Sequence, residues 1–223
     1  MDILELRGIS KGFPDGEGNF RRVLSGIDLT VSEGEMACLT GPSGSGKTTL
    51  LKIMGTLLPA DEGKLILSGR EITSQSDLPS IRNSEIGFVF QDSRLLPQLT
   101  VLQNILLPTL AKEKTPSEET SKYALSLLEY TGIESLSHRY PETLSGGEKG
   151  RVALCRALVM KPGLILADEP TGQLDHDNAI RIASLLKRIS RDFRTGVVCV
   201  THSADVSALA DRSISLEELN NRN

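Results

Sequence analysis

The first 90 residues alternate short apolar stretches with turn-forming residues, a pattern typical of β-strands. Apolar side chains occupy every second position in three segments bounded by Gly, Asp or Ser: residues 3–6, 23–31 and 64–67. Residues 36–40 and 86–90 are instead continuous apolar runs, which predict strands buried on both faces. We therefore expect this part of the chain to be built mainly from strands.

From about residue 91 the apolar positions adopt helical spacing, and further on strands and helices alternate. Helices are predicted at residues 117–130 and 145–160. After them the predicted order is strand 164–167, helix 178–190, strand 197–201 and helix 203–210. Strands that alternate with helices predict an α/β fold with a mostly parallel sheet covered by helices. Residues 91–160 are expected to interrupt that sheet as a helical insertion.

Composition narrows the class of protein further. The 223 residues are 39% hydrophobic, and 25 Lys and Arg against 29 Asp and Glu leave a net charge of −4. This balance disfavours a protein that holds nucleic acid by bulk positive charge. No apolar run approaches the length of about 18–20 residues that spans a bilayer, and the acidic N-terminus lacks the plan of a signal peptide. Cys38, Cys155 and Cys199 are far apart and flanked by apolar residues, so we expect reduced core thiols in a soluble intracellular protein.

Residues 41–48 fit the phosphate-loop pattern G-x-x-x-x-G-K-[ST], and they stand between a predicted strand and a predicted helix at 49–58. Glycines let the backbone wrap around a polyphosphate, and the N-terminus of the helix adds its dipole. Lys47 is expected to reach the β- and γ-phosphates and Thr48 to ligate Mg²⁺. The residues predicted to bind the nucleotide are Gly41, Pro42, Ser43, Gly44, Ser45, Gly46, Lys47, Thr48 and Thr49.

Two adjacent carboxylates, Asp168 and Glu169, end the apolar run 164–167. Taken alone, such a pair is usually a solvated strand end or a helix cap. A parallel sheet, however, delivers these residues to the edge where the phosphate loop also lies. Asp168 is therefore expected to hold Mg²⁺, and Glu169 to polarise the attacking water or accept its proton.

Residues 144–148 read Leu-Ser-Gly-Gly-Glu and precede a predicted helix. Their local chemistry is that of a capping box, in which a Ser caps the helix and a Glu follows three positions later. A Ser hydroxyl and free N–H groups at a helix start also suit an anion. The residues at this helix start are Ser145, Gly146, Gly147 and Glu148.

Together with the phosphate loop, this segment resembles the signature of ABC-type ATPases, and the resemblance covers nearly the whole chain in the family's order and spacing. It implies one P-loop NTPase domain over residues 1–223. A RecA-like core and an N-terminal antiparallel β subdomain would use 1–90 and 161–223, and 91–160 would form the helical subdomain with the signature. The implied reaction is hydrolysis of ATP with Mg²⁺ as the metal.

The resemblance also assigns roles to single residues. Gln91 resembles the glutamine that contacts Mg²⁺ and the attacking water, and His202 resembles the switch histidine that senses the γ-phosphate. Asp175 would lie near a partner subunit. Phe13, in a segment 12–18 whose glycines predict a loop, stands where the family places an aromatic ring on adenine, although Phe20 is an alternative.

Some residues depart from the family pattern or carry no motif. Gly150 and Gln173 stand where the family usually has other residues. His138 and His176 have no motif partners and are expected to be exposed. A run of basic residues predicts a solvated helix face: Arg181, Lys187, Arg188, Arg191 and Arg194.

In this family the signature of one subunit completes the site of another, so the resemblance implies a homodimer around two MgATP. Residues 86–91 and 95–108 resemble the subgroup around the LolD, MacB and FtsE ATPases, which serve membrane permeases in lipoprotein release, macrolide or peptide export, or division signalling. The implied partner is a separate integral membrane permease, with no nucleic acid, and the implied location is the cytoplasmic face of the cell membrane. A non-transport signalling ATPase like FtsE is the alternative. Leu95, Leu96, Leu99 and Leu102 could contact the permease or belong to the core.

Overall fold

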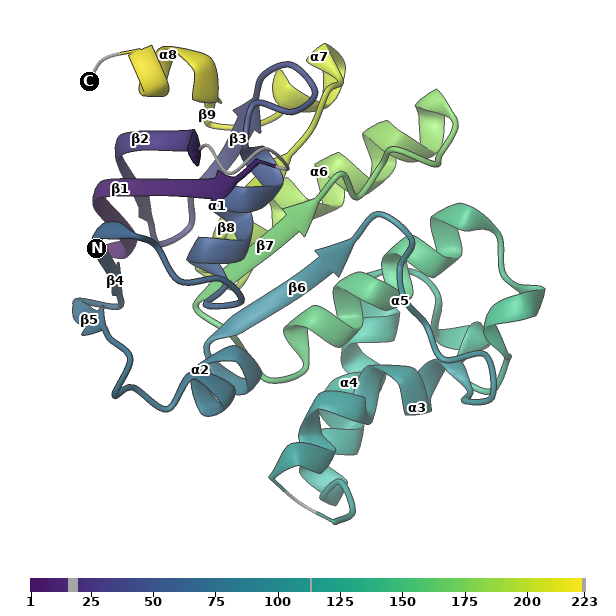
Figure 1. Cartoon of the computed structure of the whole chain (residues 1–223). Helices are drawn as coiled ribbons and strands as arrows, with labels where there is room; N and C mark the ends of the chain where they lie inside the picture. The colour runs from purple at the N-terminus through teal and green to yellow at the C-terminus, as the bar shows by residue number, and fades with distance from the viewer. Residues whose placement is uncertain (16–19, 113, 222–223) are drawn as a thin grey trace.

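The computed structural model describes residues 1–15, 20–112 and 114–221, and these form two sheets with helices around them (Figure 1). The first sheet is antiparallel, with strand order β2-β1-β4-β5. Its strands are β1 (Asp2–Pro14), β2 (Phe20–Ser32), β4 (Glu62–Leu67) and β5 (Arg70–Ile72).

The second sheet is parallel, with strand order β6-β7-β8-β3-β9. Its strands are β6 (Ile86–Phe90), β7 (Leu164–Asp168), β8 (Gly196–Val200), β3 (Met36–Thr40) and β9 (Arg212–Ser215). The predicted α/β class with a mostly parallel sheet is confirmed. Strands β3 and β6 have the predicted bounds, because a strand buried on both faces leaves a continuous apolar run in the sequence.

The predicted helices are present with shifted ends, whereas the α-helices within residues 78–106 and after residue 215 were not predicted as separate elements. The α-helices are α1 (Lys47–Met54), α2 (Leu78–Ser84), α3 (Val101–Leu106), α4 (Glu118–Tyr130), α5 (Gly146–Leu158), α6 (His176–Asp192), α7 (Ala204–Ser207) and α8 (Leu216–Asn221). Three short 3₁₀ helices are η1 (Leu107–Ala111), η2 (Glu134–Leu136) and η3 (Pro141–Thr143). The helix predicted at 49–58 begins and ends earlier, and the one predicted at 203–210 is only a single turn.

The prediction of a loop at residues 12–18 is wrong for its first part. Gly12, Phe13 and Pro14 belong to β1 and pair with β2, whereas residues 16–18 lie outside the described residues. Register shifts after Leu6 and Ile9 interrupt the alternation of apolar positions. β-Bulges of this kind hide the length of a strand from a period-two pattern.

Two hydrophobic clusters cover opposite faces of the parallel sheet. In β7, Leu164 and Leu166 face the cluster shared with α1 and the antiparallel sheet, whereas Ile165 and Ala167 face the cluster shared with α5 and α6. Figure 1 shows these layers, with α3, α4 and α5 gathered away from the antiparallel sheet. Cys38, Cys155 and Cys199 are buried free thiols in the second cluster, as predicted. Within the described residues, no helix is long and apolar enough to cross a membrane.

Helix α5 packs unusually close to its neighbours because glycines face it or lie within it. A Cβ placed on Gly87 of β6 would lie 2.5 Å from the carbonyl oxygen of Ala157 in α5. A Cβ on Gly150, one of the departures from the family pattern, would lie 3.2 Å from Cδ1 of Ile182 in α6. Gly150 is thus a packing residue between two helices, which explains a poor helix former at this position.

The basic run on α6 is exposed at Arg181, Arg188 and Arg191, as predicted for a solvated helix face, and only Lys187 is partly buried. Lys187 forms an ion pair with Asp211, and the guanidinium of Arg188 lies 4.3 Å from the centre of the Tyr130 ring. Arg188 also donates to the Tyr130 carbonyl at 2.8 Å, so these side chains tie α6 to its neighbours. Arg194 lies beyond the end of α6 and pairs with Glu33. His138 and His176 are exposed, as expected.

We predict that Gly87→Ala lowers the free energy of unfolding by about 2 kcal/mol, because the new methyl group forces backbone of β6 and α5 apart. Gly150→Ala is the matched control. The new methyl group of Gly150→Ala contacts only the end of the flexible Ile182 side chain, and alanine favours the helix more than glycine does. The free energy of unfolding is therefore expected to change by no more than about 1 kcal/mol. Urea unfolding of the two variants tests this, and an equal effect of both substitutions would contradict it.

Candidate functional site

Four adjacent parallel strands deliver the predicted site residues to one edge of the sheet. β6, β7, β8 and β3 are neighbours in that order, and all run in the same direction. Their carboxyl ends lead into Gln91, into Asp168 and Glu169, into His202, and into the phosphate loop 41–48. In open α/β sheets ligands bind at this edge.

The phosphate loop leads into α1 through backbone shapes that need glycine. Gly41, Gly44 and Gly46 have φ values of 147°, 79° and 102°, in the region that other residues rarely adopt. Lys47 is only 5% exposed, and its Nζ donates to the carbonyl oxygens of Gly41 and Pro42 at 2.8 Å each. Oγ of Ser45 is buried and has no hydrogen-bond partner among the residues that the structure describes. The loop thus places the Lys47 ammonium group and the Ser45 hydroxyl group at the start of α1.

Thr48 and Asp168 are brought together from positions 120 residues apart. The Thr48 hydroxyl donates to Oδ1 of Asp168 at 3.4 Å. Burial raises the pKa of Asp168, and the negative charge of Glu169 adds to the effect. A hydroxyl and a carboxylate are the hard oxygen donors that Mg²⁺ prefers, and a cation there would relieve the cause of the raised pKa. The residues present therefore fit Mg²⁺, although no cluster of three or more His, Cys, Asp or Glu in the described chain could hold a metal by itself.

Glu169 and His202 form a direct pair at the ends of β7 and β8. Nε2 of His202 lies 2.9 Å from Oε1 of Glu169, and both side chains remain partly exposed. Glu169 has a φ of 47°, which is uncommon for a residue with a side chain. Its N–H donates to the Val200 carbonyl at 3.0 Å, which helps to hold this backbone shape. Strained backbone of this kind clusters at functional sites.

Gln91 follows β6 and is exposed, with its amide directed at the turn after β7. A Cβ on Gly172 would lie 3.1 Å from Nε2 of Gln91 and 3.5 Å from Oε2 of Glu169. The Gln91 amide and the Glu169 carboxylate therefore lie against the same glycine. Asp175, a little further along, caps α6 by accepting from the N–H of Asn178 at 2.9 Å.

The signature segment forms the predicted capping box at the start of α5. The Glu148 carboxylate accepts from the N–H and the hydroxyl of Ser145 at 2.7 and 2.8 Å, and these contacts hold the pKa of Glu148 below its usual range. Ser145 and Gly146 are exposed. In Figure 1 α5 is separated from α1 by β6 and β7, so one chain does not bring its signature to its own phosphate loop.

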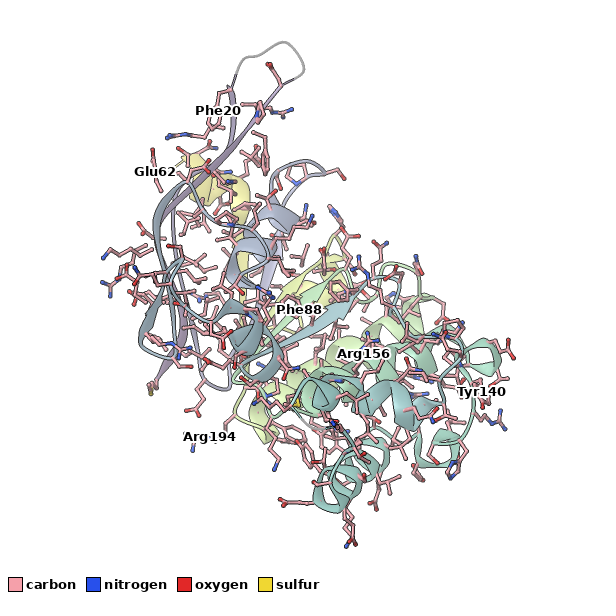
Figure 2. The ribbon with its side chains drawn as sticks, turned by 60° about the horizontal axis from the view of Figure 1, so that its bottom comes forward. Phe20, Glu62, Phe88, Tyr140, Arg156 and Arg194 are labelled. Atoms are coloured by element: carbon pink, nitrogen blue, oxygen red, sulfur yellow. The ribbon has the colours of Figure 1, made fainter. Side chains whose placement is uncertain are left out.

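Phe13 and Phe20 both lie on the hairpin of β1 and β2, with exposed fractions of 38% and 64%. Figure 2 shows Phe20 on the part of this hairpin that projects from the molecule. The root of the hairpin reaches the phosphate loop, because a Cβ on Gly46 would lie 2.8 Å from Cγ1 of Val23. Both aromatic rings are therefore exposed on the same hairpin, and the structure does not decide which of them packs on adenine.

Sequence reasoning missed two residues that shape this region. Asp61 accepts from Nζ of Lys11 at 2.5 Å and from the N–H of Gly12 at 2.9 Å, just before Phe13. Asn104 is fully buried and accepts from the N–H of Leu96 at 2.7 Å while donating to three carbonyls of the same loop. Asp61 belongs to no motif, and Asn104 lies in the family-like segment 95–108 without an assigned role, so only the backbone partners seen in the structure reveal what each residue does.

The four leucines after Gln91 were expected either to contact a permease or to belong to the core, and the structure divides them between partly buried and exposed positions. Leu95 and Leu102 pack against the hydrophobic cluster around α5, and Leu99 is partly buried. Leu96 is 39% exposed and is therefore the one of the four that is most available to a partner.

We predict that Ser145→Ala lowers the free energy of unfolding by about 1 kcal/mol at pH 7, because the cap of α5 is lost. Part of this loss depends on ionised Glu148, whose folded pKa is depressed. That part is present above the unfolded pKa and disappears as the pH falls below about 4.3. Urea unfolding at pH 7 and at acidic pH measures the difference. Ser117→Ala, a cap with Thr120 three positions later, is expected to lose the same amount at both pH values.

The comparisons with known proteins agree with this geometry. Residues 24–172 match the family model described as ABC transporter. The chain is 41% identical over 217 residues to the lipoprotein-releasing system ATP-binding protein LolD of Roseobacter denitrificans, covering 96% of this chain and 95% of the relative. LolD 1 of Rhodopirellula baltica is 43% identical over 207 residues, or 92% of this chain and 90% of the relative.

Solved structures show the same fold. The dimeric structure of MJ0796, a bacterial ABC transporter cassette, has a TM-score of 0.83 at 38% identity and covers 95% of this chain and 93% of the cassette. Its post-hydrolysis state bound to ADP and phosphate has a TM-score of 0.83 at 37% identity with the same coverage. The chain therefore belongs to the ABC transporter family, as a LolD-like ATP-binding protein that hydrolyses ATP.

Proposed function

We propose that the edge formed by β3, β8, β7 and β6 binds MgATP and that Glu169 is the general base for its hydrolysis. The observation that carries this proposal is the pair of Glu169 and His202, 2.9 Å apart beside the phosphate loop. A carboxylate held by a histidine is positioned to accept a proton from water. His202 then senses the γ-phosphate, so that it links the base to the group that is cleaved.

The other residues bind and orient the substrate. The N–H groups of residues 41–49 and the dipole of α1 hold the phosphates, and Lys47 moves its hydrogen bonds from the loop carbonyls to phosphate oxygens. Thr48, Asp168 and Gln91 would hold Mg²⁺, and the bound ion would neutralise phosphate charge. Phe13 or Phe20 packs on the adenine ring.

We further propose that two copies of the chain meet head to tail around two MgATP. The signature residues 145–148 lie apart from the phosphate loop of the same chain, which supports completion of each site by the other copy. Residues 91–160 form the helical subdomain that carries the signature, and 1–90 with 161–223 form the nucleotide-binding part. The dimer of the MJ0796 cassette supports this arrangement.

The physiological partner is a separate membrane permease of the lipoprotein-releasing type. The names of the LolD relatives support this choice over export of macrolides or peptides and over signalling like that of FtsE. The segment 95–108, with its exposed Leu96 and with Asn104 holding the loop that precedes α3, is the surface that meets the permease. The chain would then lie on the cytoplasmic face of the membrane through this contact.

We predict that Glu169→Gln lowers kcat for ATP hydrolysis by about 10²-fold or more, because the base is lost, while ATP binding is retained. The dimer with ATP then accumulates, since its phosphate contacts persist. Calorimetry measures the binding of ATP, and size-exclusion chromatography with ATP measures the accumulation of the dimer. An ATPase assay measures kcat. Glu129→Gln makes the same chemical change at an exposed position of α4 and is expected to leave kcat unchanged. Full turnover by Glu169→Gln would refute the assignment.

Capture of the tagged chain from native membranes tests the partner. We expect an integral membrane permease to co-purify with the chain. We also expect the ATPase activity of the chain in this complex to change when a lipoprotein is added. Leu96→Asp is expected to weaken capture of the permease and to leave hydrolysis by the isolated chain unchanged, because only the exposed loop is altered. Co-purification with a partner that moves no lipoprotein would favour the signalling alternative.

A further inference from the structure

The turn after β6 has a backbone shape that its own residues do not favour. Ser93 and Arg94 have φ values of 56° and 44°, and neither is a glycine. Two consecutive residues in this left-handed region are unfavourable for side chains with a Cβ. Contacts from outside the turn must therefore stabilise it, and the turn begins at Gln91, at the edge of the nucleotide site.

Arg156 of α5 supplies those contacts. One guanidinium nitrogen donates to the Arg94 carbonyl at 2.7 Å and the other to the Ser93 carbonyl at 2.5 Å. A planar fork of two donors fits two consecutive carbonyls, which the single ammonium of a lysine cannot match in the same geometry. Arg156 lies in a groove with Phe88 and Phe90, and Figure 2 shows it where the helical part of the molecule meets the sheet.

The turn also contacts β6, through a residue of the same groove. The guanidinium of Arg94 lies 4.1 Å from the centre of the Phe90 ring, at the end of β6. The turn is thus clasped between β6 and α5, and α5 is the helix that begins with the signature. Close packing of Gly87 on Ala157 joins the same two elements.

We propose that Arg156 is a positioning residue that acts on hydrolysis through Gln91, by transmitting the orientation of the signature helix to the turn. This inference rests on the proposed role of Gln91 at Mg²⁺ and the attacking water. The link is physical, because Gln91 directs its amide at Gly172 beside Glu169, while its backbone leads directly into the turn that Arg156 holds.

The test is a double-mutant cycle on ATP hydrolysis by the purified chain. We expect Arg156→Lys to lower kcat by about tenfold and to change KM for ATP by less than about twofold, since the phosphate loop that carries most of the proposed contacts with ATP is unaltered. In a Gln91→Ala background, we expect the same substitution to lower kcat by less than about twofold, because residues that act through one another are not additive.

Two further variants keep the result interpretable. Arg82→Lys is the matched control, because Arg82 lines the same groove and donates to a different carbonyl, that of Thr56, at 3.1 Å. Its kcat is expected to stay unchanged. If Arg156→Lys does not fold, Arg94→Ala removes the contact with the Phe90 ring at an exposed residue, keeps the Cβ that disfavours the turn, and is expected to show the same pattern in the cycle.

The outcomes separate the two proposals. Full activity of Gln91→Ala would overturn the proposed role of Gln91 itself. A strong effect of Gln91→Ala together with additive losses from Arg156→Lys would overturn this inference alone, because Arg156 would then act by another route. An equal loss in Arg82→Lys would also overturn it, since any arginine in the groove would have the same effect.

Discussion

The site depends on one constraint, the order of four parallel strands. Because β6, β7, β8 and β3 are consecutive neighbours, their carboxyl ends bring a glutamine, two carboxylates, a histidine and the phosphate loop to a single edge. These residues are far apart in the sequence, and no local contact could gather them. Burial of both faces of the sheet fixes the register, since a slip by one residue would exchange the two hydrophobic faces.

The same architecture explains why the site is divided. The signature stands at the start of α5, in the helical layer, whereas the phosphate loop opens α1 on the other side of β6 and β7. The strand β6 lies between these regions, packs against α5 through Gly87, and leads into Gln91. A shift of the helical layer must therefore act on β6 and the turn that follows it, because close-packed elements transmit displacement instead of absorbing it.

Much of this could be predicted from the sequence where the signal is local. The continuous runs at β3 and β6, the cap Ser145 and the phosphate loop all depend on neighbouring residues. Elements with little buried surface, such as α2 with Ile81 alone and the half-exposed β9, left no apolar pattern to recognise. Contacts between residues far apart in the sequence also leave no local pattern that could be recognised. Glu169 was assigned from its place after an apolar strand and His202 from family resemblance, and neither signal predicted that the two side chains pair. Ser93 and Arg156 are 63 positions apart, and no local pattern indicates their contact.

The burial of every thiol has a practical consequence for following the motion of this molecule. Cys38, Cys155 and Cys199 are all 0% exposed, and burial raises the pKa of the Cys155 thiol to about 12, which keeps it protonated and unreactive. A single cysteine introduced on the surface of the otherwise native chain would thus be the preferred target of a maleimide dye or spin label. Distances between such labels, one near α5 and one near α1, would report the opening and closing of the assembled cassette in solution without prior removal of the native cysteines.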